Sequence, residues 1–243
     1  MNCQTRRRLL AGCSGLLIAM LAALPGQAAT PPLKIVVYGG TGRIGQRIVD
    51  EALNRGHTVT VVVRDPSKES RQHARLKVRK GDVLESASVA QLMAGQDVLV
   101  SSVSGFDLPA DFFPRVARSL VQAARGVGAK APRIVWVGGA SSLPTEPGGR
   151  PASETSPDAK PFQKGKLEAL VYLRTVQDVS WTELTPPTDI EPGVRTGKFR
   201  LGNDVLLKDA AGKSAISMED YAVALLDEIE QPRHVRARFT LAY

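Results

Sequence analysis

Residues 35–45 read Ile35-Val36-Val37-Tyr38-Gly39-Gly40-Thr41-Gly42-Arg43-Ile44-Gly45. An apolar run leads into glycines at three-residue spacing, and an amphipathic run through Leu53 follows. This order predicts a strand, a tight loop and a helix. A helix start presents unpaired N–H groups and the positive end of the helix dipole, and glycines let a phosphate approach that backbone closely. The stretch therefore predicts a site for the pyrophosphate of a dinucleotide.

The rest of the chain continues this alternation of apolar strands and amphipathic helices. Strands are predicted over residues 34–38, 58–63, 76–78, 97–103, 133–137, 180–184 and 239–242. Helices are predicted over residues 44–55, 86–92, 112–125, 164–176 and 218–229, with Ser86 and Ser217 as N-caps and Gly56 after the first helix. Near-continuous apolar strands separated by helices are typical of a parallel sheet covered on both faces. The predicted fold class is therefore α/β, a Rossmann-type doubly wound parallel sheet.

Two stretches fall outside this alternation. Residues 140–161 are rich in Pro, Ser, Gly and Glu and are predicted to form a long loop. After Pro186-Pro187, polar and apolar residues alternate over Lys198–Leu207, which predicts a hairpin in a small C-terminal annex on the substrate side. The sequence contains no internal repeat or linker, so residues 29–243 are expected to form a single NAD(P)-binding Rossmann domain.

Composition and charge limit the possible functions. The 243 residues are 43% hydrophobic and 23% charged, which is ordinary for a globular protein. The net charge of +8 falls to +5 without the three arginines of residues 1–28, and this surplus suits phosphate-bearing ligands. Only 5% of the residues are aromatic and no basic run is interleaved with them, which argues against nucleic acid as a partner. His57, His73 and His234 lack metal-ligand spacing, so no metal site is predicted.

The first 28 residues are predicted to be a cleaved export signal. The basic run Arg6-Arg7-Arg8 precedes a short apolar run over residues 16–24, and small residues allow cleavage after Ala28. An arginine pair followed by two leucines favours twin-arginine export, with Sec export as the alternative. Lipidation at Cys13 and an uncleaved membrane anchor are further alternatives, although the apolar run is short for a membrane span. The expected location is the periplasm, or the cytoplasm if this segment is not a signal.

The end of the second predicted strand distinguishes between the two nicotinamide dinucleotides. An acidic residue there binds the ribose 2′-hydroxyl of NAD, whereas an arginine accommodates the 2′-phosphate of NADP. Arg64 comes first at this position, and Arg43 in the glycine loop adds a second cation whose shape suits phosphate. Asp65 follows directly and leaves NAD open as the less favoured cofactor. The predicted cofactor is therefore NADP.

Further cofactor contacts are expected at the carboxyl ends of the next strands, where open α/β sheets bind their ligands. Asp82 and Val83 follow the third strand, close to the expected adenine, and Ser101 and Ser102 end the fourth. The cofactor-binding residues predicted from the pattern are Gly39, Thr41, Gly42, Arg43, Ile44, Gly45, Arg64, Asp82, Val83, Ser101 and Ser102.

These residues resemble the atypical short-chain dehydrogenases/reductases, in the NAD(P)H-binding group of NmrA-like proteins and biliverdin reductase B-like flavin reductases. The likeness covers residues 33–243. Its strongest marks are residues 34–66, Trp181-Thr182, Pro186-Pro187, residues 195–200 and residues 216–222. The resemblance implies that Pro186 borders the nicotinamide and that residues 217–222 begin the last helix near the substrate.

One departure from this family bears on the chemistry. Short-chain dehydrogenases usually carry a Tyr-x-x-x-Lys pair, in which the lysine lowers the pKa of the tyrosine so that it can transfer a proton. Here the nearest equivalent is Phe162-Gln163-Lys164-Gly165-Lys166, and a phenyl ring has no proton to give. By the resemblance, Ser141 or Ser142 after the fifth strand could occupy the family's serine position, and these are the candidate catalytic residues. A serine alone is a poor acid.

Three functions are compatible with this site. The first is an NADPH-dependent reductase that passes hydride directly to a small redox acceptor such as a flavin or quinone, with solvent as the proton source. The second is an NmrA-like redox sensor or interaction protein that binds the dinucleotide without turnover. The third is a sugar epimerase or dehydratase, which the missing tyrosine disfavours. The expected partner is a small-molecule acceptor, with no membrane span after signal cleavage, and the oligomeric state is left open.

Overall fold

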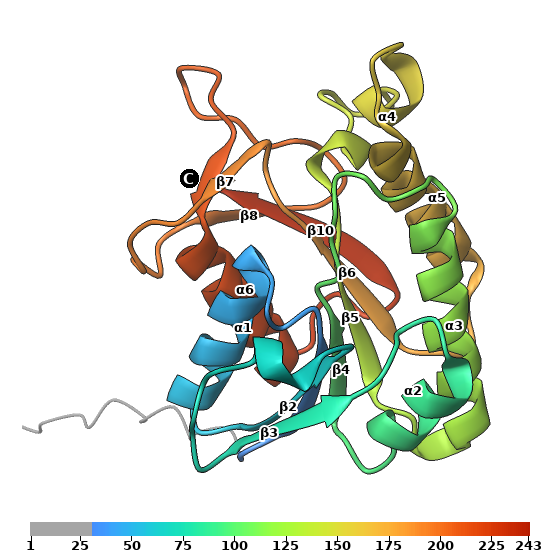
Figure 1. The fold of residues 1–243 in the computed structure, drawn as a ribbon. Helices are drawn as coiled ribbons and strands as arrows, with labels where there is room; N and C mark the ends of the chain where they lie inside the picture. Colours follow the sequence, from blue (N-terminus) through green and yellow to red (C-terminus); the bar gives the residue numbers. More distant parts are fainter. Residues whose placement is uncertain (1–30) are drawn as a thin grey trace, which may run out of the picture. The chain divides into compact units, whose positions relative to one another are not determined.

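The structure, a computed structural model, describes residues 31–243. The predicted export signal, with its cleavage site after Ala28, lies outside the described residues. Within the described range, no helix is long and apolar enough to cross a membrane. Figure 1 shows a central sheet with helices on both of its sides.

An eight-stranded sheet organises the described residues. In spatial order its strands are β3 (Leu76–Lys80), β2 (Thr58–Val63), β1 (Lys34–Tyr38), β4 (Val98–Ser101), β5 (Arg133–Val137), β6 (Trp181–Thr185), β10 (Ala237–Ala242) and β8 (Arg200–Gly202). Every neighbouring pair is parallel except β10 and β8, which are antiparallel. The strand order reverses at β1, from which the chain first builds outward to β3 and then crosses to β4 on the other side. This doubly wound topology confirms the predicted Rossmann-type fold.

The strand β1 illustrates why these segments form buried strands. Ile35, Val36 and Val37 are fully buried, and successive side chains point to opposite faces of the sheet. β-Branched side chains fit the pleated surface, and burial on both faces explains why the run shows no polar alternation. Val36 pairs with Thr60 of β2 on one side and with Leu99 of β4 on the other. The glycine loop therefore leaves the sheet from an interior strand.

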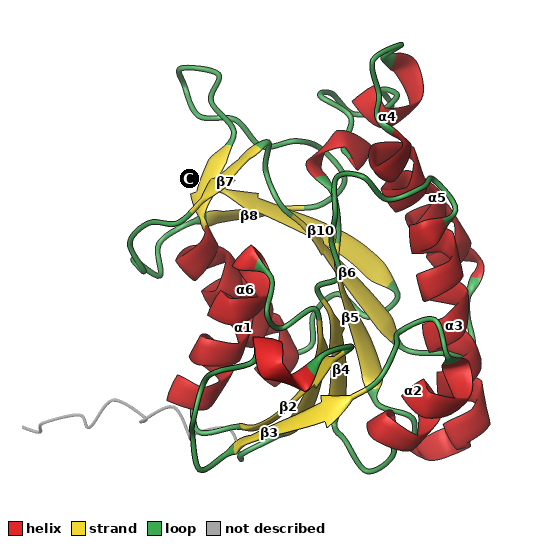
Figure 2. Cartoon of the chain, in the orientation of Figure 1, coloured by secondary structure: helices red, strands yellow, loops and turns green. Residues whose placement is uncertain are grey.

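Helices cover both faces of the sheet, as Figure 2 shows. The helices α1 (Arg43–Asn54) and α6 (Met218–Glu230) pack together on one face. The helices α2 (Ser86–Met93), α3 (Phe112–Val127) and α5 (Pro161–Thr175) pack on the other face. Each layer closes its own hydrophobic cluster against the strands.

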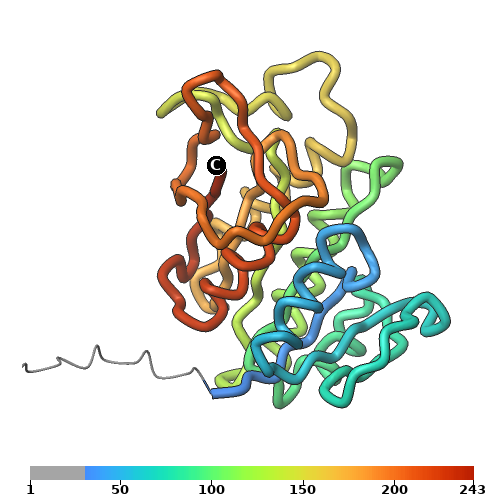
Figure 3. Tube along the Cα trace, turned by 90° about the vertical axis from the view of Figure 1, so that its left-hand side faces the viewer, coloured from blue at the N-terminus to red at the C-terminus, as the bar shows by residue number. Residues whose placement is uncertain are grey.

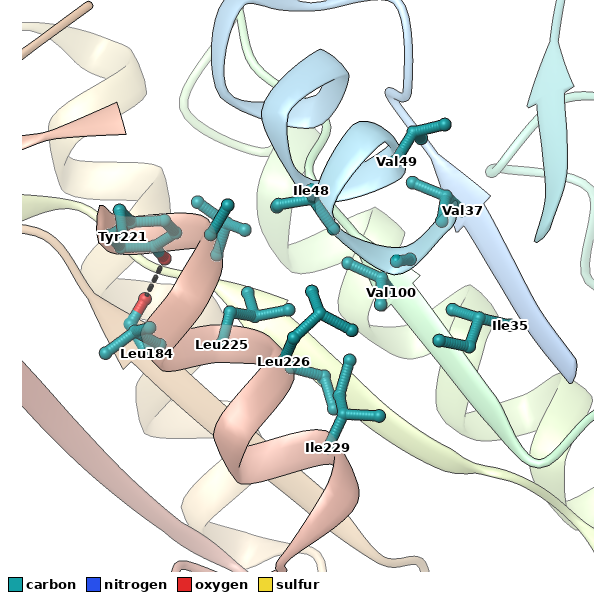
Figure 4. Close-up of a cluster of buried hydrophobic side chains, with 14 of the residues drawn as sticks. Ile35, Val37, Ile48, Val49, Val100, Leu184, Tyr221, Leu225, Leu226 and Ile229 are labelled. Carbon is teal, nitrogen blue, oxygen red and sulfur yellow. Dashed lines mark hydrogen bonds between the residues drawn. The ribbon is translucent and has the colours of Figure 1, made fainter. Parts of the chain in front are cut away.

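The cluster beneath α1 and α6 shows what holds the glycine loop's helix in place. Ile48 of α1 and Leu225 and Ile229 of α6 meet Ile35 and Val100 of the sheet (Figure 4). All five side chains are buried, and fully burying one of them contributes about 1.5–3 kcal/mol. The packing of α1 against α6 and the sheet therefore helps the glycine loop to hold the start of α1 in place.

The C-terminal annex differs from the prediction. Within Lys198–Leu207 the structure forms one short strand, β8, which pairs with β10 and does not fold into a hairpin. The hairpin prediction is wrong because the edge of β10 offers unpaired main-chain groups, and pairing with this distant strand satisfies them. Two further short strands, β7 (Asp189–Glu191) and β9 (Ala215–Ser217), form a separate parallel pair.

Two other local predictions need correction. Residues 140–161 contain a 3₁₀ turn, η3 (Ala140–Ser142), and a short helix, α4 (Ala152–Thr155), so they are not a continuous loop. The N-cap of α2 is Glu85, since its carbonyl accepts from the Val89 N–H, and Ser86 is the first helical residue. Two more 3₁₀ turns are η1 (Pro66–Lys68) and η2 (Gly128–Lys130).

The cap predicted for the last helix is confirmed. The Ser217 hydroxyl accepts a hydrogen bond of 3.0 Å from the Asp220 N–H at the start of α6. Gly56, with a φ of +88°, follows α1 as predicted for a glycine after a helix end.

Candidate functional site

The glycine loop has a conformation that side chains would prevent. Gly39 has a φ of +78°, and a Cβ atom there would collide with the carbonyl of Ser102. A Cβ atom on Gly45 would collide with the Gly39 carbonyl oxygen. The Gly42 N–H donates to that same oxygen at 3.0 Å and closes the turn before α1. The glycines thus let β1, the loop and the first turn of α1 lie in direct contact.

The start of α1 offers backbone donors for an anion. Gly42 is the N-cap and has no side chain to satisfy them, and the first turn contains no acidic residue. The first intrahelical bond runs from the Gln46 N–H to the Gly42 carbonyl at 2.9 Å, so the preceding N–H groups have no intrahelical acceptor. Thr41 is held nearby, its carbonyl accepting from the Gln46 side chain at 2.9 Å. Glycines without Cβ atoms and free helix donors together fit a pyrophosphate.

Two charged residues follow β2, the exposed Arg64 and Asp65, and the Asp65 carboxylate is hydrogen-bonded to Ser67. Arg64 is exposed directly after the strand. The Asp65 carboxylate accepts hydrogen bonds from the Ser67 N–H at 3.1 Å and from the Ser67 hydroxyl at 2.8 Å. These two bonds cap η1 and hold the pKa of Asp65 below its usual value. Asp65 therefore has a structural task at this position that Arg64 does not share.

Arg43 points toward the annex. Its guanidinium pairs with the Glu191 carboxylate of β7, and both side chains are exposed. A second pair joins Arg47 of α1 to Glu219 of α6 at 3.2 Å. In Figure 3 the orange annex segment runs beside the start of the blue α1. To bind a 2′-phosphate, Arg43 would have to break its exposed ion pair with Glu191 and pair with the phosphate in its place.

Arg71 connects the glycine loop to the segment between η1 and β3. Its guanidinium donates to the Gly40 carbonyl at 2.8 Å and to the Gln46 carbonyl at 3.1 Å. It also pairs with Glu69 at 2.6 Å and with Asp50 at 3.0 Å. One side chain therefore fixes two main-chain carbonyls next to the predicted phosphate site. No motif in the sequence pointed to Arg71, because these contacts depend on how a loop folds back across α1.

The remaining residues predicted to bind the cofactor from the third and fourth strands lie at the same sheet edge. Asp82 follows β3, and its carboxylate accepts from the Leu84 N–H at 2.9 Å, while Val83 is buried. Ser101 is the last residue of β4 and is buried. The Ser102 N–H donates to the Tyr38 carbonyl at 2.9 Å, and its own carbonyl packs against Gly39. The structure thus brings the ends of β1 and β4 into contact at the glycine loop.

The two candidate serines lie in η3, after β5. The Ser142 hydroxyl donates to the Gly139 carbonyl at 2.7 Å, and Arg238 of β10 donates to this hydroxyl at 3.2 Å. Ser142 is buried, so its hydroxyl serves the turn, whereas Ser141 is half-buried. Pro186 is buried and directly follows β6. The neighbour of β6 in the sheet is β5, the strand that η3 follows.

Lys166 is a buried cation at the ends of β4 and β5. Its ammonium donates to the Val137 carbonyl at 2.8 Å and to the Val103 carbonyl at 3.4 Å, and it is only 7% exposed. The rings of Phe113 and Trp136 lie 4.3 and 5.6 Å from it. Burial lowers the pKa of Lys166 to about 8, against the opposing attraction of Glu183. The lysine of the expected Tyr-x-x-x-Lys pair is therefore present, but its ammonium binds main-chain carbonyls at the ends of β4 and β5.

Glu183 of β6 is the buried acid that faces this lysine. One carboxylate oxygen accepts from the Thr185 hydroxyl at 2.8 Å, and within the described residues the other, Oε2, has no hydrogen-bond partner. Burial raises the pKa of Glu183, although Arg238 and Lys166 act against the shift. A Cβ on Gly138 would lie 2.7 Å from Glu183 Oε1, so the carboxyl lies directly under the segment that follows β5.

Phe162 occupies the position of the expected tyrosine, one turn before Lys166 in α5. Its ring meets the ring of Phe106 edge to face, with centroids 5.4 Å apart and planes at 85°. Phe106 comes from the loop after β4. The sequence singled out Phe162 by its spacing to Lys166, whereas Phe106 had no such signal, because only the folded chain brings the two rings together.

The match to a family of known proteins classifies this site. A family model described as NAD(P)H-binding matches residues 39–232, which run from the first glycine of the loop to just beyond α6. The chain belongs to this NAD(P)H-binding family. The match confirms the resemblance to the atypical short-chain dehydrogenases/reductases, and the cofactor is a nicotinamide dinucleotide.

Three solved structures are similar to this chain over nearly its full described length. One from Burkholderia pseudomallei, provisionally named an exported protein, is 43% identical, with a TM-score of 0.77, and the match covers 87% of this chain and 100% of that one. One from Bacteroides thetaiotaomicron, provisionally named an epimerase, is 36% identical, with a TM-score of 0.80 and coverage of 87% and 97%. One from Streptococcus pneumoniae, provisionally named an NADH-flavin reductase, is 29% identical, with a TM-score of 0.73 and coverage of 86% and 99%.

Proposed function

We propose that this protein is an NADPH-dependent reductase that passes hydride directly to a flat redox acceptor, such as a flavin or a quinone. The observation that carries this proposal is Phe162 at the position where a proton-donating tyrosine is expected, one turn before the buried Lys166. Reduction of a flavin or quinone needs no positioned acid, since the hydride is accepted by the ring and solvent supplies the proton. The similar Streptococcus pneumoniae protein, provisionally named an NADH-flavin reductase, supports this choice.

The chain's own residues would bind and orient the reactants. The glycine loop and the start of α1 would hold the pyrophosphate, and Pro186 and η3 would border the nicotinamide ring. The bound dinucleotide supplies the hydride. Lys166 holds the ends of β4 and β5 together through its two carbonyl contacts, and would thereby support the sheet edge on which the ring is expected to bind. Catalysis would then come mainly from holding two planar rings at reacting distance.

The preference for NADP over NAD is supported by the end of β2. Arg64 is exposed directly after the strand, whereas Asp65 uses one carboxylate oxygen, Oδ1, to cap η1 through Ser67. A guanidinium suits a phosphate dianion in both charge and shape. Arg43, in exchange for its exposed partner Glu191, would add a second cation.

Arg64→Ala tests the cofactor preference. Because the 2′-phosphate is present only in NADPH, the variant should bind NADPH about 10 to 100 times more weakly, the value of one charge-assisted phosphate contact, and NADH almost unchanged. Arg125→Ala is the matched control, since it removes an exposed arginine at the far end of α3, where it pairs with Asp178. Equal losses for both dinucleotides would overturn the NADP assignment.

Steady-state oxidation of NADPH and NADH with riboflavin, FMN and menadione tests the activity itself. Turnover with any of these acceptors, faster with NADPH, supports the reductase. Tight NADPH binding without turnover would favour a redox sensor of the NmrA type. The similar Bacteroides thetaiotaomicron protein, provisionally named an epimerase, makes a sugar epimerase the third outcome, detected as conversion of a nucleotide sugar without net oxidation of the cofactor.

We also propose export to the periplasm. The basic and apolar pattern of residues 1–28 supports it, as does the similar Burkholderia pseudomallei protein, which is provisionally named an exported protein. A twin-arginine route would carry the folded protein together with its dinucleotide, which suits a compartment where free NADPH is not expected to be regenerated.

A further inference from the structure

Phe106 is an unusually exposed aromatic side chain beside the candidate site. It is 77% exposed, the highest value among the exposed large hydrophobic side chains of residues 31–243. Covering an exposed phenyl ring removes apolar surface from water and is therefore favourable. The edge-to-face contact with Phe162 holds the Phe106 ring against α5 while most of its surface stays open.

The loop that carries Phe106 is anchored to α5. Gly165 lies against the Ala110 carbonyl so closely that a Cβ atom would collide with it. Leu108 packs against Gly105 inside the same loop, where a Cβ would lie 2.9 Å from its side chain. These contacts anchor the loop on both sides of Phe106 in the sequence, and the Phe162 ring then orients Phe106, which lowers the entropy lost when a ligand binds.

The aromatic pair lies at the edge of the sheet that holds the dinucleotide. Phe162 is four residues before Lys166, whose ammonium contacts the Val103 and Val137 carbonyls at the ends of β4 and β5. The Ser102 carbonyl, four residues before Phe106, packs against Gly39 of the glycine loop. The segments that carry the two rings thus start from the carboxyl edge of the sheet, where the dinucleotide is expected and which the hydride acceptor must approach.

Exposed charges of both signs surround the aromatic pair and favour recognition through the ring itself. Asp107 and Asp111 belong to the Phe106 loop, and Lys160 and Lys164 flank Phe162 at the start of α5; all four are exposed. Asp111 also lies 3.7 Å from the exposed Arg115 of α3, so acids and bases are mixed at this edge and neither sign dominates. Selection by charge is therefore weak, whereas stacking of a planar ring on a phenyl face does not depend on charge.

We propose that Phe106, braced by Phe162, stacks the planar ring of the acceptor, so that the substrate class is a flat conjugated ring such as an isoalloxazine or a quinone. The inference rests on the proposed reductase function. It adds that the specificity-determining contact is an aromatic face, and that a flavin's phosphate contributes little.

The test uses the full-length protein saturated with NADP⁺. Riboflavin binding is followed by its fluorescence, and menadione is titrated as a competitor. Phe106→Ala should weaken riboflavin binding and menadione competition by about tenfold or more, the usual loss for one aromatic stacking partner. Phe106→Trp should retain binding, and Phe106→Leu, apolar but not planar, should lose most of it. In 0.15 M salt, the affinities for FMN and riboflavin should differ by less than about threefold, since the nearby charges are exposed, of both signs and screened.

Val171→Ala is the matched control, because Val171 is an exposed apolar residue, 54% accessible, on the same helix as Phe162. It should leave riboflavin binding unchanged, and none of the four variants should change the affinity for NADP⁺. Wild-type ring binding in Phe106→Ala, with turnover intact, would overturn the stacking proposal and leave the reductase standing. Ring binding lost in Phe106→Ala, in a protein without turnover, would support the stacking site and overturn the reductase.

A protein partner is the competing occupant of an exposed phenylalanine. A shift of apparent molecular mass between wild type and Phe106→Ala on size exclusion, together with unchanged riboflavin affinity, would assign the residue to a protein contact and overturn the proposal.

Discussion

Gly45 shows how much one residue without a side chain contributes to this site. A Cβ there would collide with the Gly39 carbonyl, so the first turn of α1 could no longer lie against the loop. Gly45→Ala should therefore weaken NADPH binding at least tenfold and lower the free energy of unfolding by about 1–3 kcal/mol, as overpacking does. Tryptophan fluorescence in a urea titration and NADPH titration measure the two effects.

Gly126→Ala is the control for that substitution. Gly126 lies in α3, and a Cβ there would meet no atom within 4 Å. Alanine is a better helix former than glycine, so this variant should be more stable by about 0.5–1 kcal/mol with unchanged NADPH affinity. If both glycine variants lost NADPH binding alike, the close approach at Gly45 would not be the cause.

Lys166 predicts a pH dependence whose sign follows from burial. Burial lowers its pKa in the folded protein to about 8 from 10.5, so between these values the unfolded chain binds more protons than the folded one. The stability that Lys166 contributes should therefore rise as the pH increases through that window. Glu183, whose pKa burial raises, acts in the opposite sense at lower pH, because there the folded protein binds more protons.

Lys166→Met isolates this contribution. As the pH rises from 8 to 10.5, the free energy of unfolding of the wild type should increase relative to that of Lys166→Met. Urea denaturation at several pH values measures this change. Lys164→Met, a change of an exposed lysine on the same helix, is the matched control for replacing a lysine of α5 by methionine. A pH-independent difference for Lys166→Met would contradict the burial of its ammonium.

At the scale of elements, Arg71 joins a loop to a helix and to the glycine loop. Arg71→Ala removes its bonds to the Gly40 and Gln46 carbonyls, and each charge-assisted bond of this kind is worth about 1.5–3 kcal/mol. Because the freed carbonyls adjoin the phosphate site, NADPH affinity should fall about tenfold. Arg71→Lys should recover only part of it, since an ammonium lacks the planar fork that reaches both carbonyls.

Isothermal titration with NADPH measures this loss, with Arg125→Ala as the variant that removes an arginine paired elsewhere. A loss of the same size for NADH is expected, because Arg71 contacts the glycine loop, where the pyrophosphate common to both dinucleotides is expected. An effect confined to NADPH would instead place Arg71 on the 2′-phosphate.

Most elements were predictable because their signals are local. The strands β1, β2 and β5 have the predicted bounds, since continuous β-branched runs leave few alternatives. The annex hairpin was wrong because β8 pairs with β10, a strand about forty residues away, and alternation within Lys198–Leu207 cannot encode that choice. The predicted N-cap of α2, Ser86, is one residue away from the observed N-cap, Glu85. An error of one residue is usual when a helix end is predicted from sequence.

At the scale of the whole molecule, the export proposal predicts a defined mature protein. Mass spectrometry of the protein from its native host should find a chain beginning at Ala29 in the periplasmic fraction, with a nicotinamide dinucleotide released on denaturation. Arg6 and Arg7 both changed to Lys should abolish twin-arginine export and leave Sec export largely intact, because the twin-arginine route requires the arginine pair. An intact Met1, or a cytoplasmic location, would contradict the proposal.

The sequence by itself determined the doubly wound sheet, the place of the glycine loop and the class of cofactor. These follow from short-range patterns, namely β-branched runs, helical periodicity and glycines at fixed spacing. Only the tertiary structure decided that Arg71 fixes the loop, that Lys166 and Glu183 are buried together, and that Phe106 meets Phe162. Each of these contacts joins segments that the parallel crossovers bring to one edge of the sheet, and no local pattern records which loop will cover which strand end.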